Sequence, residues 1–526
     1  MNYIKHLHIL GFKKIKELDV DFNEHVNILV GENEAGKSTI LDAIKIVLNQ
    51  LYRNADKSIL KDLFNIDDIN TFYKSPSIKN LPQIIIEVEF DLDSQAKNAE
   101  YFFGEVYGEQ KSQLEKYGIS FQCKFDETLG SELYDEINSG KIPYEYYSLT
   151  WKTFGNKPYQ TIKRPLNFIN IDITGKDSTS SFNYYNKNLF NSIYESNKRV
   201  NAKYQFRDKL EESFKTIDLQ PIDEKRIFGV DSKKVPLESI LSVYEDNIAL
   251  ENHGSGMECL IKTKIALDKR SGLNVILMEE PENHLCFSTM KKMLSEITKQ
   301  QESSQLIITT HSNMIASHLN LKNLLWIANN KSISLKNVND DDAIFFEKAD
   351  DNAFLQLLLS SKAILVEGAT ESLLIPHFYK QQTGKSLEDE NITLISCRGI
   401  SYNRYLSVTK NLNKKIAVIT DNDSVMERIL YSISFNKANT NQHIFMGKTE
   451  EEWTWEKCIY DCNKESLENI IQITENAQYF FHGKDYGQYL GKMLNNKAEI
   501  AYQMLNSGIE FNIPEYIKEA INWLNE

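Results

Sequence analysis

The stretch Val26–Ser38 reads VNILVGENEAGKS, a mostly apolar strand pattern that runs into a loop beginning at Gly31 and ending in Gly36-Lys37-Ser38. A helical pattern follows directly. The loop fits G-x-x-x-x-G-K-[ST], in which glycines let backbone N–H groups point at phosphates. We therefore expect Lys37 to reach the β and γ phosphates of ATP and Ser38 to bind Mg²⁺, with the positive end of the helix assisting. The positions expected to contact the nucleotide are Gly31, Asn33, Gly36, Lys37, Ser38 and Thr39.

A second apolar strand pattern, Val275–Met278, runs into two adjacent acids, Glu279 and Glu280. One acid can hold Mg²⁺ while its neighbour orients the attacking water, so we assign Glu279 to the metal and Glu280 to the catalytic base. A charged turn after a strand would produce the same letters. His311 follows the next expected strand, Leu306–Thr310, where a histidine can sense the γ-phosphate, and this favours the nucleotide interpretation.

Between these motifs, Gly254-Ser255-Gly256 opens a further helical pattern. In this order the motifs resemble the ABC-type ATPase heads of SMC, RecF and OLD proteins. In such heads the signature turn of one subunit caps ATP bound by the other. The resemblance therefore implies a dimer in which Ser255 and Gly256 act in trans. The turn departs from the LSGGQ form of transporters, which leaves its contacts open.

Two later apolar strand patterns also end in acids. Glu367 ends the first and Glu371 follows it at a helix start, while Asp421 and Asp423 follow the second. Because parallel strands end at one edge of a sheet, we expect these four carboxylates to converge. Crowded carboxylates repel one another, and Mg²⁺ or Mn²⁺ is the natural compensation. Such a cation would activate water and neutralise charge on a phosphodiester, whereas the alternative is four unrelated, solvated acids.

This pattern resembles a TOPRIM domain, and its position after an ABC-type head resembles the OLD (overcoming lysogenisation defect) family, including the larger subunit of the Gabija defence system. The resemblance implies a nuclease in which Glu367 and Asp421 are catalytic metal ligands. It also implies Glu456 as a ligand of a second metal and Lys497 as the lysine that stabilises the pentacovalent phosphate. Either residue would otherwise be a solvated surface residue. Where relatives carry a glycine-rich turn, this chain has Arg398, which binds phosphate or caps a helix.

The 526 residues are 41% hydrophobic and 25% charged, which is typical of a soluble protein of two or three domains. No membrane-spanning stretch or signal peptide is evident, so we expect a cytoplasmic protein. The net charge of −14 excludes a broadly basic surface for nucleic acid, although a local groove stays possible. The six cysteines are scattered; a zinc site at Cys458 and Cys462 is the less favoured alternative to reduced structural thiols.

We expect an α/β fold throughout: an ABC/SMC-like head with a mainly helical dimerisation insert, then a TOPRIM domain with C-terminal helices. The expected boundaries are 1–95 and 250–340 for the head, 96–249 for the insert, 341–355 for a linker and 356–526 for the TOPRIM domain. The resemblance covers most of 1–95 and 250–510, whereas the insert is matched by position only.

These features predict an ATP-binding, Mg²⁺- or Mn²⁺-dependent DNA endonuclease whose access is controlled by nucleotide. We expect a homodimer or larger homo-oligomer that acts in defence against phage. One alternative is a DNA-clamping ATPase of the RecF or SMC kind with a non-cleaving TOPRIM domain. The four acids argue against it, because a binding domain gains little from keeping repelling carboxylates together. A second alternative is a defence effector held silent by a partner, such as a helicase or the reverse transcriptase and branched DNA of a retron.

Overall fold

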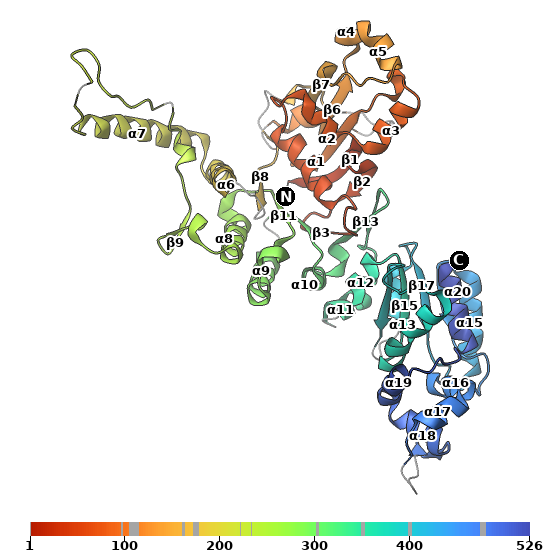
Figure 1. Ribbon diagram of the computed structural model, residues 1–526. Helices are drawn as coiled ribbons and strands as arrows, with labels where there is room; N and C mark the ends of the chain where they lie inside the picture. The colour runs from red at the N-terminus through yellow and green to blue at the C-terminus, as the bar shows by residue number, and fades with distance from the viewer. Residues whose placement is uncertain are drawn as a thin grey trace. The chain divides into compact units, whose positions relative to one another are not determined.

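The computed structural model describes residues 2–95, 98–104, 115–159, 164–171, 178–220, 222–232, 234–300, 304–348, 353–397, 402–473 and 480–526. The chain divides into two compact units, Met1–Asn337 and Val338–Glu526 (Figure 1). Both units are α/β, as predicted. None of the described helices is long and apolar enough to cross a membrane.

A six-stranded sheet of order β14-β13-β3-β12-β11-β8 carries the nucleotide motifs of the first unit. Its strands are parallel except for β14, which pairs antiparallel with β13. Every residue of β3 and of β12 is buried, which explains their nearly continuous apolar runs. The strands are β3 (Val26–Val30), β8 (Phe168–Ile171), β11 (Val275–Glu279), β12 (Gln305–Thr309), β13 (Leu324–Ala328) and β14 (Lys331–Ser334).

A second, antiparallel sheet of order β2-β1-β4-β6-β5, with β7 paired to β6, belongs to the same unit. Helix α1 (Lys37–Asn49) packs against β1, β4 and β6, and most of its residues are buried. One hydrophobic core therefore joins this helix to strands of both sheets. The strands are β1 (Tyr3–Phe12), β2 (Ile15–Asp21), β4 (Ile84–Asp91), β5 (Phe103–Gly104), β6 (Lys116–Phe125) and β7 (Tyr147–Thr153).

The region 96–249, expected to be a mainly helical insert, also supplies strands β5 to β8 to the two sheets. The expected boundary at residue 96 therefore falls within the antiparallel sheet. The strand pattern of β6 is concealed because four consecutive residues are buried and include the small Gly118 and Ser120. A Cβ at Gly118 would lie 2.2 Å from the ring of Phe154, so only glycine fits there. The helices of this region are α4 (Glu127–Gly130), α5 (Tyr134–Asn138), α6 (Ser178–Ile193) and α7 (Ser196–Lys215).

Five further helices complete the described part of the first unit. They are α2 (Leu60–Leu63), α3 (Ile66–Lys74), α8 (Ser255–Leu267), α9 (Phe287–Gln300) and α10 (Asn313–His318). Helices α8 and α9 pack against each other. Two short strands, β9 (Tyr244–Glu245) and β10 (Ile248–Ala249), form a hairpin before α8.

The second unit contains a wholly parallel sheet of order β16-β15-β17-β18. Its strands are β15 (Lys362–Val366), β16 (Ile392–Ser396), β17 (Lys415–Ile419) and β18 (Gln442–Phe445). Its helices are α12 (Ala353–Leu359), α13 (Ala369–Thr383), α14 (Tyr402–Thr409), α15 (Met426–Ala438), α16 (Trp455–Cys462), α17 (Lys464–Ile470), α18 (Gln488–Asn495), α19 (Lys497–Asn506) and α20 (Glu515–Asn525). Side chains of the sheet, α13 and the C-terminal helices share one core.

The predicted linker 341–355 is a helix over much of its described length. Helix α11 spans Asp340–Lys348, with three acidic residues in its first turn. Acids at this end are stabilised by the unpaired N–H groups of the helix, so the acidic run marks a helix start rather than a solvated linker. Residues 349–352 of the predicted linker lie outside the described residues.

The buried amide of Gln305 ties the two sheets of the first unit together. It accepts a hydrogen bond from Ile4 N (2.9 Å) and donates to the carbonyl oxygens of Ile4 (2.8 Å) and Asn23 (2.9 Å). These backbone groups would otherwise lack partners in a water-free interior.

We expect Gln305→Leu to lower the free energy of unfolding by about 2–4 kcal/mol, because it leaves buried polar groups without partners. Chemical denaturation should show this loss, whereas Gln95→Leu, at an exposed position, should change the midpoint little. Equal midpoints for Gln305→Leu and the unmodified protein would contradict the bridging role.

Candidate functional site

The loop between β3 and α1 has the shape of a phosphate-binding loop. Gly36 caps α1 with a φ of 99°, a conformation that favours glycine. A Cβ at Gly31 would lie 2.3 Å from the carbonyl oxygen of Ile327, so this close backbone approach also requires glycine. The Lys37 ammonium donates to the carbonyl oxygens of Gly31 and Glu32, both at 3.0 Å. It is thus held inside the loop where phosphates would lie.

The ends of β11 and β12 bring Glu280 and His311 together beside this loop. The N–H of Glu280 donates to the Thr309 carbonyl oxygen at 3.0 Å, and Glu280 Oε1 lies 3.6 Å from His311 Nε2. Burial and the charge of Lys37 lower the pKa of His311, so the ring is neutral at neutral pH and the contact is not an ion pair. Burial also lowers the pKa of Lys37, against the opposing influence of Glu280.

Glu282 belongs to this cluster, although sequence reasoning gave it no role. Its Oε1 accepts hydrogen bonds from the Thr310 hydroxyl (2.8 Å) and from the N–H of His311 (2.6 Å). Its Oε2 is buried and has no hydrogen-bond partner. Its charge also acts on Lys37. Its place directly after Glu279-Glu280-Pro281 was the signal available in the sequence.

The remaining nucleotide residues occupy the positions that the motifs predict, and their roles stay predictions. Glu279 ends β11 and pairs in register with Thr309 of β12. Ser255 and Gly256 open α8, and a Cβ at Gly256 would lie 2.9 Å from the His284 carbonyl oxygen.

In the second unit, Glu367 and Asp421 meet because they lie just beyond the ends of two adjacent parallel strands. Glu367 directly follows β15, and Asp421 is the second residue after β17. Glu367 Oε1 accepts a hydrogen bond from the Thr420 hydroxyl and another from the N–H of Asp421 at 3.2 Å. Backbone pairing therefore sets the spacing of these carboxylates.

The start of α16 holds Asp421 in place. Asp421 accepts hydrogen bonds from the N–H of Trp455 (2.7 Å) and the hydroxyl of Thr454 (2.8 Å). The same hydroxyl lies 2.8 Å from Glu456 Oε2, so Thr454 connects the two acids. Lys497, the first residue of α19, donates to Glu456 Oε2 at 2.9 Å. The contacts through Thr454 thus place Glu456 and Lys497 beside Asp421.

Mutual repulsion and burial make the ionised form of the clustered carboxyl groups unfavourable. Burial, reinforced by nearby carboxylates, raises the pKa of Asp421 and of Glu371 to about 7. Burial lowers the pKa of Lys497, but the charges of Glu456 and other acids outweigh it and raise the pKa overall. Four carboxylates therefore face one ammonium group.

Asp423 is turned toward a different partner. It lies at a φ of 52° and forms an ion pair with Arg428. Both line a pocket of about 480 Å³ together with Glu367, Asp421 and Tyr402. Asp423 thus shares the pocket but does not contact the other acids, and its role as a metal ligand stays a prediction.

The donor chemistry fits a hard divalent cation, because carboxylate oxygens are the ligands that Mg²⁺ and Mn²⁺ prefer and their repulsion calls for positive charge. Within the described residues, no three acidic, histidine or cysteine side chains are arranged to hold a metal ion. Binding would therefore require a rearrangement of these side chains.

The sequence also offered a zinc site at Cys458 and Cys462 and a role for Arg398. Burial raises the pKa of Cys458 to about 12, which disfavours the thiolate that a zinc site needs. Arg398 lies outside the described residues.

Comparisons with protein families match both units. The AAA ATPase domain model matches residues 3–316, and the model for the TOPRIM domain of overcoming lysogenization defect protein-like proteins matches residues 358–423. The chain belongs to the AAA ATPase domain family. With its OLD-like TOPRIM match it fits the ATPase–TOPRIM architecture of OLD proteins, and the predicted fold class, an ATPase head followed by a TOPRIM unit, is confirmed.

Individual relatives match shorter parts of the chain. The Old nuclease of Escherichia phage P2 is 25% identical over 261 residues, 43% of this chain and 44% of that protein. The DNA replication and repair protein RecF of Clostridium kluyveri is 33% identical over 87 residues, 16% of this chain and 23% of that protein. The chain spans less than half the length of either relative. The SmcHead in its crystal structure with the C-winged helix domain of ScpA gives a TM-score of 0.35 at 16% identity, covering 64% of this chain and 99% of that one.

We expect Lys37→Met to weaken ATP binding by about 10- to 100-fold, because a charged hydrogen-bond donor to phosphate is lost while the buried apolar stem is kept. Titration with a fluorescent ATP analogue measures this. Lys74→Met, an exposed lysine of α3, serves as the control and should bind normally. Unchanged affinity in Lys37→Met would contradict the assignment.

We expect Asp421→Asn to stabilise the metal-free protein by up to about 4 kcal/mol above pH 7. The pKa of Asp421 is raised from 3.8 to about 7, so the ionised group destabilises the folded state fully above pH 7 and progressively less as the pH falls toward 3.8. The gain should therefore shrink below pH 7. Denaturation in EDTA at several pH values tests this, with the exposed Glu388→Gln as the control; a gain that does not depend on pH would refute it.

Proposed function

We propose that this protein is an ATP-binding, divalent-metal-dependent DNA endonuclease whose nuclease site is controlled by nucleotide. The observation that carries the proposal is the convergence of Glu367, Asp421 and Glu456, with Lys497, at the carboxyl edge of the parallel sheet. The family match of the TOPRIM unit and the similarity to the Old nuclease support it.

In this proposal Glu367, Glu371, Asp421 and Glu456 hold Mg²⁺ or Mn²⁺, with Asp423 joining them if it leaves Arg428. The metal would supply a Lewis acid for water and the phosphodiester. Thr454 and the N–H of Trp455 orient Asp421. Lys497 exchanges its contact with Glu456 for an oxygen of the scissile phosphate, where its positive charge stabilises the transition state.

The first unit binds ATP with Lys37 and Ser38 at the phosphates, Glu279 at Mg²⁺ and Glu280 as the base, while His311 senses the γ-phosphate. Neutral His311 beside Glu280 is in a state to donate or accept a hydrogen bond. Ser255 and Gly256 would complete the site of a second copy, so a homodimer is the smallest active assembly that we propose.

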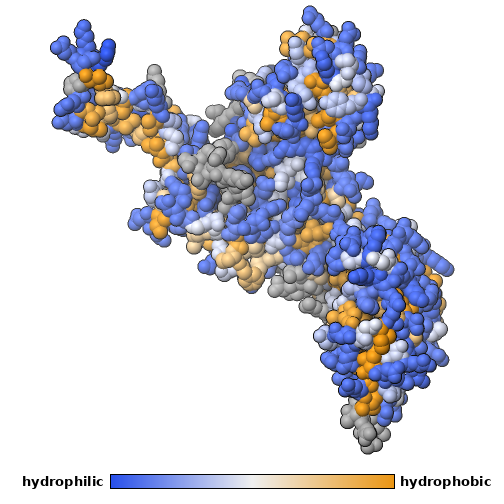
Figure 2. Space-filling model, in the orientation of Figure 1, coloured by the Kyte–Doolittle hydropathy of each residue, from blue (hydrophilic) through white to orange (hydrophobic). Residues whose placement is uncertain are grey.

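The region 96–249 is the proposed dimerisation insert. No residue of α7 is buried. Exposed apolar side chains, including Ile222, Ile227 and Phe228, follow that helix. Figure 2 shows hydrophobic and hydrophilic side chains side by side on the segment that contains α7. A second copy would remove such apolar side chains from water.

Antiphage defence in the cytoplasm, with a helicase or a retron reverse transcriptase as the partner, is the biological setting that we propose from the family resemblance. A clamping ATPase without cleavage is the rival function. The similarity of 87 residues to RecF favours that rival in the head alone.

Cleavage of supercoiled plasmid tests the proposal. The purified protein should nick or linearise DNA with Mg²⁺ or Mn²⁺, and its activity should change when ATP is added. Asp421→Asn and Glu367→Gln should lower the cleavage rate by about 10²-fold or more, because each removes charge from the proposed metal site. Glu388→Gln, which removes an exposed carboxylate from the same unit, should cut normally.

Intact DNA under every metal and nucleotide condition, combined with tight DNA binding, would favour the clamp. Equal loss of activity in Glu388→Gln would show that the effect is not specific to the site.

A further inference from the structure

Two adjoining pockets lie along α6 and α7. The first has a volume of about 540 Å³ and the second about 440 Å³, and Lys187 lines both. We call them together the arm groove. Its cationic side chains are Arg164, Lys187, Arg199, Lys203 and Arg207.

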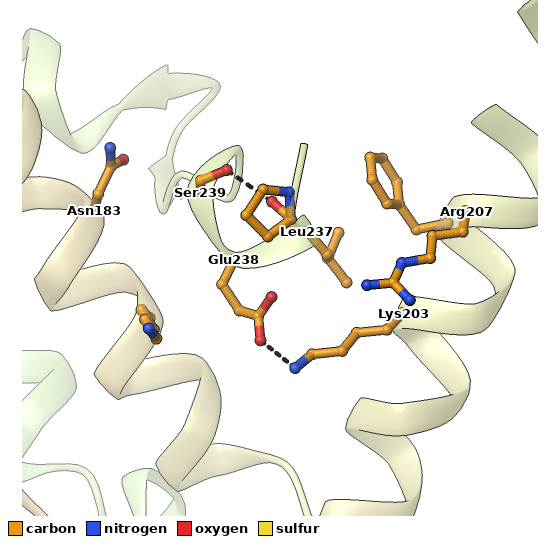
Figure 3. A pocket seen from close by; sticks show the side chains of 9 residues that line it. Asn183, Lys203, Arg207, Leu237, Glu238 and Ser239 are labelled. Atoms are coloured by element: carbon orange, nitrogen blue, oxygen red, sulfur yellow. Dashed lines mark hydrogen bonds and ion pairs between the residues drawn. The ribbon is translucent and has the colours of Figure 1, made fainter. Parts of the chain in front are cut away.

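Positive charge exceeds negative charge in the arm groove, although the whole chain carries a net charge of −14. Its acids are Glu195 and Glu238. Glu238 is already paired with Lys203, and Figure 3 shows these two side chains pointing toward each other with Arg207 reaching into the same space. Within the described residues, the carboxylate of Glu238 is in salt-bridge distance of Lys203, and the charge of Lys187 also acts on it. With five cations facing two acids, the arm groove offers an excess of positive charge to a ligand.

Neutral polar groups and aromatic rings accompany these cations. Arg199 donates to Asn191 Oδ1 (2.6 Å) and to the Ser196 hydroxyl (3.0 Å), but its buried Nε has no partner. Tyr194, whose exposed fraction is 46%, lines the second pocket, and Phe206 lines the first. Arginine, lysine and asparagine donors are the usual contacts of nucleic-acid phosphates, and exposed aromatic rings stack on unpaired bases.

We propose that the arm groove binds the phosphate backbone of a nucleic-acid strand. An acidic protein surface would also be attracted by charge. A run of cations across two adjoining pockets, which asparagine side chains also line, fits a regularly charged backbone better. This binding site is separate from the carboxylate cluster and does not depend on the proposed cleavage.

Fluorescence anisotropy in EDTA tests the proposal, because no metal-dependent cleavage can then occur. The probes are a labelled DNA strand of mixed sequence and the matching duplex, each titrated with full-length protein over a range of salt concentrations. The triple variant Arg164→Gln, Lys187→Gln, Arg207→Gln removes three positive charges from the groove and keeps the salt bridge between Lys203 and Glu238. We expect it to bind on the order of tenfold more weakly and to lose about 2 from the slope of log affinity against log salt.

A matched variant keeps the test specific. Lys74→Gln, Lys79→Gln, Lys292→Gln removes the same charge from exposed positions elsewhere in the unit and should bind nearly as tightly as the unmodified protein. The single exposed variant Arg207→Glu should weaken binding even if the triple variant folds poorly. A larger effect with the single strand would assign the aromatic rings to unpaired bases, whereas equal effects would assign the groove to the backbone alone.

Four outcomes would overturn the proposal. The first is unchanged affinity of the triple variant and of Arg207→Glu, and the second is an equal loss in the matched variant. The third is competition by polyglutamate as strong as that of unlabelled DNA at equal charge. The fourth is a change of oligomeric state without a change in DNA affinity, which would make the arm groove a protein interface.

Discussion

Parallel pairing of short, buried strands is the constraint on which both units depend. The interiors of β3, β12, β15 and β17 are mostly apolar, and the residues that carry chemistry follow the ends of these strands. Parallel pairing brings those ends to one edge. The nucleotide motifs and the carboxylate cluster are therefore both edge features, and the hydrogen bond from the N–H of Asp421 to Glu367 shows how directly the backbone sets their spacing.

The two sheet edges are suited to ligands of opposite charge. In the first unit, Lys37 donates to backbone carbonyl groups of the loop and the charges of Glu280 and Glu282 act on it, an arrangement suited to a bound anion. In the second unit, several buried carboxylates share the single ammonium group of Lys497, an arrangement suited to a bound cation. The same sheet architecture therefore serves opposite electrostatic purposes, and only the residues after the strands decide which.

Local patterns predicted the strands that carry chemistry, because an apolar run with an adjacent motif is visible within a few residues. The predicted strands Val275–Met278 and Leu306–Thr310 lie within one residue of the observed bounds of β11 and β12. Features set by tertiary contacts were not visible. Ser120 and Gly118 conceal β6 because both are buried, and the acidic run before Ala343 is the first turn of a helix. Likewise, spacing alone made Asp423 equivalent to Asp421, whereas the structure pairs Asp423 with Arg428. Thr454, which links Asp421 to Glu456, carried no signal of its own.

The raised pKa values of Asp421 and Glu371, both about 7, mean that the metal-free protein carries exchangeable protons at this edge near neutrality. A cation that binds these carboxylates has to displace those protons into solution. The heat of metal binding then includes the ionisation enthalpy of whichever buffer takes them up. Calorimetric titrations in two buffers of equal pH but different ionisation enthalpy would therefore give different apparent enthalpies for the same binding event, and the difference would count the protons released.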